Sequence, residues 1–140
     1  MNIQYKYNVL TSDDYLAFSK KMDEEETTRE QAELTIANQV FSVAAIKDGE
    51  YIGIARLLGD KAIFWLIIDV WVLPEYQGKG IGRKLMEILI QYIKENAPKG
   101  YHSISLMSAK GKEGFYEKLG FMPRPHTWEG AGMEMEIKIE

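Results

Sequence analysis

Residues 67–92 read IIDVWVLPEYQGKGIGRKLMEILIQY, and this stretch decides the fold of the 140-residue chain. Residues 67–72 are mostly β-branched or aromatic, which is typical of a strand buried on both faces. Asp69 is the one polar residue in that run. Pro74 cannot donate a hydrogen bond to a sheet, so we expect the strand to end near Leu73.

A helix is predicted after the glycines of this stretch. Its apolar residues recur at the spacing of one helical face, at Leu85, Ile88, Leu89, Tyr92 and Ile93. Such a stripe packs a helix back onto a sheet. The stretch is therefore predicted to be a strand, a glycine-rich loop and a helix.

The loop has the chemistry of an anion-binding site. A helix start carries unpaired N–H groups and the positive end of the helix dipole, and glycines let a ligand approach them closely. Lys79, Arg83 and Lys84 add positive charge there, which the dipole alone would disfavour. The alternative is a glycine-rich turn that only tightens the connection between strand and helix.

Two nucleotide-binding patterns do not fit the loop. A P-loop requires a lysine and a hydroxyl residue after its last glycine, whereas Arg83 and Lys84 follow Gly82. A dinucleotide fingerprint that starts at Gly78 requires a glycine where Arg83 stands. Neither motif therefore explains the loop.

A third pattern fits. QGKGIG at residues 77–82 resembles the Q/R-x-x-G-x-G/A motif of the GNAT (Gcn5-related) N-acetyltransferases, and FYEKLGF at residues 115–121 resembles a second signature of that family. The two occur in the family's order, and the resemblance covers the chain from about residue 40 to its end.

The resemblance implies a coenzyme A site. The strand residues Val70, Trp71 and Val72 would pair with the pantetheine arm of acetyl-CoA. The loop would hold its pyrophosphate through backbone N–H groups, over Gln77, Gly78, Lys79, Gly80, Ile81, Gly82 and Arg83. Relatives often have an asparagine where this chain has Ala109, so Ser108 would supply that contact or it is absent.

Two residues are candidates for the chemistry. The resemblance makes Tyr116 the general acid that protonates the leaving thiolate; a core tyrosine is the alternative. Asp69 is a candidate for amine binding or general base, although a structural ion pair with Arg56 explains two charged residues inside strands equally well. Strict strand alternation puts Asp69 on the face opposite Val70.

The fold expected is a single α/β (α+β) domain over residues 1–140. It has a mixed, strongly twisted sheet of about six or seven strands and about four helices, as in GNAT enzymes. Strands are predicted at residues 3–7, 40–47, 51–58, 62–72, 102–107 and 133–139, with another beginning at Phe121. Helices are predicted after residues 11–14, at 28–38, from the end of the glycine loop to about Asn96, and at 113–119.

Composition excludes several classes. The chain has no cysteine, so it has no disulfide and no cysteine nucleophile, which favours direct acyl transfer. No metal site is expected, and a net charge of −4 argues against a nucleic-acid binder. No signal peptide or membrane span is recognised, so a cytoplasmic protein is expected. The acidic run at residues 23–30 is either a solvated helix face or a rim that attracts a cationic amine.

The predicted activity is direct transfer of the acetyl group of acetyl-CoA to a primary amine of a small molecule. Its acceptor is not specified by the sequence. The alternatives are a non-catalytic acyl-CoA sensor on the same fold and a protein N-acetyltransferase. The exposed aromatic residues expected here are compatible with a homodimer.

Overall fold

The computed structural model describes residues 2–24 and 26–140. These form two compact units, residues 1–107 and residues 108–140, and each is described by itself. None of the described helices combines the length and the apolar character needed to cross a membrane.

The larger unit is built on a five-stranded sheet with the order β1-β2-β3-β4-β5. Pairing is antiparallel from β1 to β4 and parallel between β4 and β5. The strands are β1 (Gln4–Tyr7), β2 (Phe41–Lys47), β3 (Glu50–Gly59), β4 (Phe64–Val72) and β5 (Ser103–Leu106). All five were predicted, because each is a β-rich run between turn signals.

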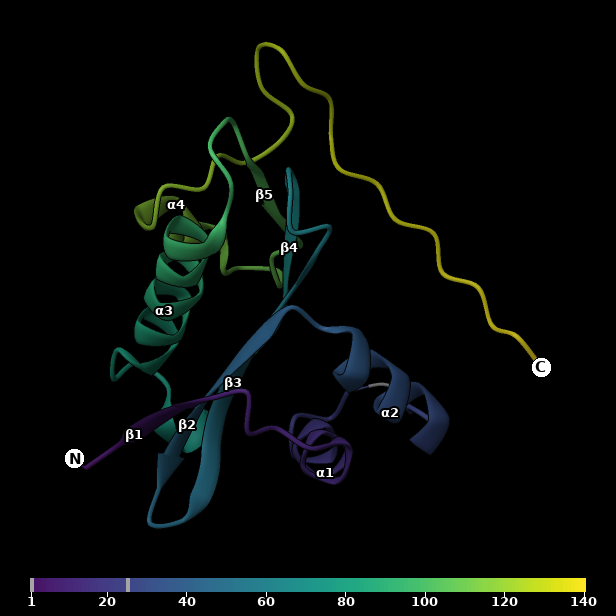
Figure 1. The fold of residues 1–140 in the computed structure, drawn as a ribbon, viewed down its shortest axis with the longest axis vertical. Coiled ribbons are helices and arrows are strands. Elements are labelled where there is room, and N and C mark those ends of the chain that lie inside the picture. Colours follow the sequence, from purple (N-terminus) through teal and green to yellow (C-terminus); the bar gives the residue numbers. More distant parts are fainter. Residues whose placement is uncertain (1, 25) are drawn as a thin grey trace. The chain divides into compact units, whose positions relative to one another are not determined.

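Helices cover both faces of this sheet. The long helix α3 (Ile81–Asn96) packs on one face, and α1 (Ser12–Lys21) and α2 (Arg29–Asn38) lie on the other (Figure 1). Thr11 and Thr28 each form a capping box, which explains why α1 and α2 begin where they do. The predicted stripe of α3 is confirmed, because Leu85, Leu89 and Ile93 are buried.

The acidic run lies mainly in the connection between α1 and α2, because α2 begins only at Arg29. It is therefore not a helix face, apart from Glu30 in the first turn of α2. Glu25, part of the same run, lies outside the described residues. Glu26 lines a cleft described below.

The smaller unit contains the helix α4 (Glu113–Lys118), as predicted, but neither of its predicted strands. After Phe121, residues 126–129 form a turn closed by a bridge between His126 and Glu129. Residues 133–139 form no ladder with any described residue, and Met133, Met135, Ile137 and Ile139 are exposed. Alternating apolar residues need a paired strand to become part of a sheet. The described residues therefore form five strands, where six or seven were expected.

Candidate active site

The glycine loop leads directly from β4 into α3. A short 3-10 helix, η1 (Pro74–Tyr76), turns the chain, and Gly80 caps α3 with a left-handed φ of 83°. Gly78 is left-handed too, with φ 76°. No atom lies within 4 Å of the Cβ position of either glycine, so both face open space. No side chain caps the α3 N-terminus, which leaves its first N–H groups for a ligand.

Side chains of the loop have distinct environments. Lys79 and Arg83 are exposed, and Arg83 Nε lies 3.4 Å from Glu87 Oε1 on the next turn. Gln77 Nε2 donates to the backbone oxygen of Val72 over 2.9 Å, which ties the loop to β4. Ile81 is buried, so only its backbone can face a ligand.

A β-bulge interrupts β4 at Asp69. Trp71 pairs with Ile54 and Ile68 pairs with Arg56, so Asp69 and Val70 together oppose a single residue of β3. Asp69 is in the left-handed region, with φ 50°. Alternation is therefore not strict, and the expectation that it would decide the face of Asp69 was wrong: the extra residue shifts the phase of the strand.

The two sides of the bulge show this shift. Before it, Ile67 pairs with Leu57, on the face that α3 covers. After it, Trp71 stacks on Tyr15 and Phe18 of α1, with ring centroids 5.7 and 6.2 Å apart, on the opposite face. Residues 67 and 71 would share one face in a regular strand.

The outer edge of β4 is open beyond its first half. The parallel ladder with β5 ends at Ile67 and Leu106, and the described residues offer no further strand to residues 68–72. Leu73 N–H donates to Ile52 O on the β3 side. Because successive peptide groups alternate, the backbones of Val70 and Val72 face the open edge. This edge runs directly into the glycine loop.

Asp69 and Arg56 form the predicted ion pair. Arg56 Nη1 donates to Asp69 Oδ2 over 2.8 Å, and the Tyr15 hydroxyl donates to the same oxygen over 3.0 Å. Asp69 Oδ1 receives no hydrogen bond from the described residues. Burial, followed by the charge of Asp69, raises the pKa of Tyr15 to about 12, so this phenol is protonated at neutral pH.

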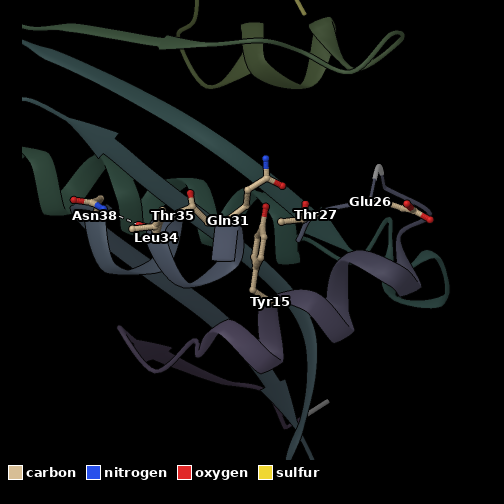
Figure 2. A pocket seen from close by; sticks show the side chains of 7 residues that line it. All are labelled: Tyr15, Glu26, Thr27, Gln31, Leu34, Thr35 and Asn38. Atoms are coloured by element: carbon tan, nitrogen blue, oxygen red, sulfur yellow. Dashed lines mark hydrogen bonds between the residues drawn. The ribbon is translucent and has the colours of Figure 1, made fainter. Parts of the chain in front are cut away.

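An open cleft of about 600 Å³ lies between α1, the α1–α2 connection and α2. Figure 2 shows the side chains that line it spread along these elements, with Asn38 at one end and Glu26 at the other: Tyr15, Glu26, Thr27, Gln31, Leu34, Thr35 and Asn38. Glu26 is the charged member of this set, and most of the others are uncharged hydrogen-bonding groups. Tyr15 and Thr35 link the cleft to the ion pair, because Tyr15 contacts Asp69 and Thr35 contacts Arg56.

The polar wall of this cleft was missed from the sequence. Gln31, Thr35 and Asn38 recur at helical spacing on α2, and Ala32 is the buried residue of that helix. A helix with so small an apolar face and a stripe of uncharged polar residues was the available signal.

The remaining predicted residues, Tyr116 and Ser108, belong to the smaller unit. Tyr116 lies on α4, half-buried, with its ring against Phe115 and Phe121. Burial raises the pKa of its hydroxyl, which keeps it protonated at neutral pH. Ser108 Oγ donates to the backbone oxygen of Ala109 over 2.8 Å.

Comparisons with known proteins agree with this architecture. The model of the acetyltransferase (GNAT) family matches residues 7–121. The chain is 36% identical over 84 residues to the GCN5-related N-acetyltransferase 2, chloroplastic, of Arabidopsis thaliana, covering 60% of this chain and 31% of that one. It is 34% identical over 87 residues to the serotonin N-acetyltransferase 2, chloroplastic, of Oryza sativa, covering 62% and 42%. The chain thus spans less than half the length of both relatives.

Solved structures share the fold over nearly the whole chain. A Staphylococcus aureus protein named "Probable Acetyltransferase" superposes with a TM-score of 0.84 at 30% identity, covering 97% of this chain and all of that one. The glucosamine-6-phosphate N-acetyltransferase of A. thaliana, at 16% identity and a TM-score of 0.71, shares the fold alone. With the family model matching residues 7–121 of 140, the chain belongs to the GNAT family of acetyltransferases.

Proposed function

We propose that this protein transfers the acetyl group of acetyl-CoA directly to a primary amine of a small molecule. One observation carries the proposal: the open edge of β4 runs into a helix N-terminus that no side chain caps and whose glycines face open space. A strand edge followed by a cluster of free N–H groups suits an elongated ligand that has amide groups at one end and phosphates at the other.

The residues present fit coenzyme A. The outward backbones of Val70 and Val72 would pair with pantetheine amides, and the N–H groups from Gly78 to Arg83 would hold the pyrophosphate, with Lys79 adding positive charge. When bound, acetyl-CoA would supply the acetyl group as a thioester, whose C–S bond breaks as the new C–N bond forms.

The acceptor side needs a neutral amine. A lysine-like amine with a pKa of about 10.4 is neutral roughly once in a thousand at pH 7, which costs about 4–5 kcal/mol. Glu26 in the cleft would attract the ammonium form, and Gln31, Thr35 and Asn38 would bind its polar groups. Asp69 Oδ1, which the described residues leave without a donor, would orient the amine or receive its proton.

Tyr116 is proposed as the general acid. Its half-buried phenol keeps its proton at neutral pH and would donate it to the leaving sulfur. The role follows from the resemblance of residues 115–121 to the second signature of the family.

An amine panel tests the proposal. Because the chain has no cysteine, every thiol released in the reaction mixture comes from coenzyme A. We expect thiol release with polar small amines and a matching mass increase of the amine by one acetyl group. Coenzyme A binding without thiol release would identify a sensor, whereas a mass increase confined to peptide lysines would identify a protein N-acetyltransferase.

A further inference from the structure

Arg56 is a buried cation to which the proposed reaction gives no role. Its side chain is 1% exposed, and its guanidinium donates to four oxygen atoms on three residues. Besides Asp69, Nε donates to Gln39 Oε1 over 2.9 Å, and Nη2 donates to both the backbone oxygen and the hydroxyl of Thr35 over 2.8 Å. A planar fork with fixed donors can satisfy such an arrangement, whereas a lysine ammonium cannot.

The bulge that Arg56 contacts is a strained element. A residue with a side chain in the left-handed region is energetically disfavoured, and it persists only where its surroundings hold it there. Asp69 is held by two side chains, Arg56 from β3 and Tyr15 from α1, which both donate to Oδ2. Arg56 is the charged one of these two donors and the more deeply buried.

The bulge determines which backbone groups reach the open edge of β4. With it, Val70 and Val72 face outward, and Trp71 packs on Tyr15 and Phe18 of α1. Without the extra residue, the phase of the strand after Asp69 would shift by one position. The outward-facing backbone would then be that of Trp71, and the predicted coenzyme A contacts would be lost.

We propose that Arg56 is a positioning residue for the cofactor strand: by holding Asp69 in its left-handed conformation, it keeps the backbones of Val70 and Val72 directed at coenzyme A. The inference rests on the proposed function for the identity of that ligand. It assigns no contact between Arg56 and substrate.

A rescue experiment separates this role from simple support of the fold. Arg56→Met removes the donors but keeps an unbranched side chain, and we expect about tenfold weaker binding of free coenzyme A by calorimetry, the scale of one strained residue. Glycine adopts the left-handed conformation without strain. The double variant Arg56→Met/Asp69→Gly, which also leaves no unpaired charge, should therefore bind within about threefold of the original protein.

Two further variants act as matched controls. Arg56→Met/Asp69→Val lacks the same two charges but places a β-branched residue at the bulge, so it should bind about tenfold more weakly than the glycine double variant. Arg29→Met removes a cation from an exposed ion pair with Asp13 and should leave coenzyme A affinity unchanged.

The backbone amide NMR shifts of residues 70–72 give a readout that does not depend on the ligand. They should move in Arg56→Met and return in the glycine double variant. A double variant that keeps the lost affinity and the altered shifts overturns the proposal, as does an Arg56→Met protein with unchanged shifts. If Arg56→Met does not fold, the proposal predicts that the glycine double variant does fold. If neither variant folds, the proposal is overturned. If the original protein does not bind coenzyme A, the proposed function is refuted. The amide NMR shifts of residues 70–72 still test whether Arg56 holds the bulge in place.

Discussion

Replacing Gly80 by asparagine or aspartate tests the glycine loop most directly. Gly80 has φ 83° and caps α3, and no atom lies within 4 Å of its Cβ position. Both side chains therefore enter open space and differ by little except charge. Each places a non-glycine residue in the left-handed region, which costs at most about 1–2 kcal/mol of folding free energy. The two variants should thus melt at nearly the same temperature, a few degrees below the original protein.

Their affinities for coenzyme A should differ. One added negative charge about 4 Å from a phosphate charge costs roughly 1 kcal/mol at the dielectric constant of water and about 4 kcal/mol at that of a protein surface. Gly80→Asp should therefore bind at least about fivefold more weakly than Gly80→Asn. Uniform steric exclusion would instead weaken both variants to the same extent.

Calorimetric titration with free coenzyme A measures this difference. It should shrink when the ionic strength is raised from about 0.05 M to about 0.5 M, because salt screens exposed charges. Folded aspartate and asparagine variants with equal affinities at low salt would refute the assignment of the loop to the pyrophosphate.

Three further outcomes are expected. Tyr116→Phe should lower the rate of thiol release about a hundredfold at saturating acetyl-CoA, while the affinity for coenzyme A stays within about twofold. Its control is Tyr101→Phe, at a fully exposed position. Equal rates in the two variants would show that Tyr116 is not the acid. Leu89 is fully buried on α3, and Leu89→Ala should lower the free energy of unfolding in urea by about 2–5 kcal/mol. Leu34 is 56% exposed, and Leu34→Ala should lower it by less than about 1 kcal/mol. Similar losses in the two variants would contradict the packing of α3. Because the pKa of Tyr15 is raised from 10.0 to about 12, the stability that its protonated phenol contributes is complete below pH 10 and is lost as the pH rises toward 12. The stability advantage of the original protein over Tyr15→Phe should shrink across that window, and parallel pH profiles would contradict the raised pKa of Tyr15.

Local sequence signals predicted the elements of the larger unit. The stripe from Leu85 to Ile93 predicted α3, and the run of apolar residues from Ala32 to Ala37 predicted α2. The cap residues at 11–14 predicted α1, because the residues that stabilise a helix start lie within one turn of it. The glycine loop followed from the same kind of signal. Glycine is required where the backbone is left-handed, and Gly78 and Gly80 are both left-handed.

The same kind of local signal was misleading after α4. Residues 133–139 alternate as a strand would, yet they pair with no described residue. A helix satisfies its backbone hydrogen bonds within its own segment, whereas a strand needs a neighbour that its own pattern does not specify. Alternation therefore indicates which residues could share a face but does not supply the partner strand.

The polar residues inside the strands show where sequence reasoning ends. The sequence by itself determined that Arg56 and Asp69 would need partners, because charge inside an apolar strand is costly unless it is compensated. The sequence left an ion pair between them and a catalytic role of Asp69 as alternatives. Only the tertiary structure showed that the ion pair forms, that Tyr15, 54 residues away, shares the carboxylate, and that Asp69 is left-handed. The physical reason is that a bulge is stabilised by side chains from other elements, and their approach is set by the packing of α1 and α2 on the sheet.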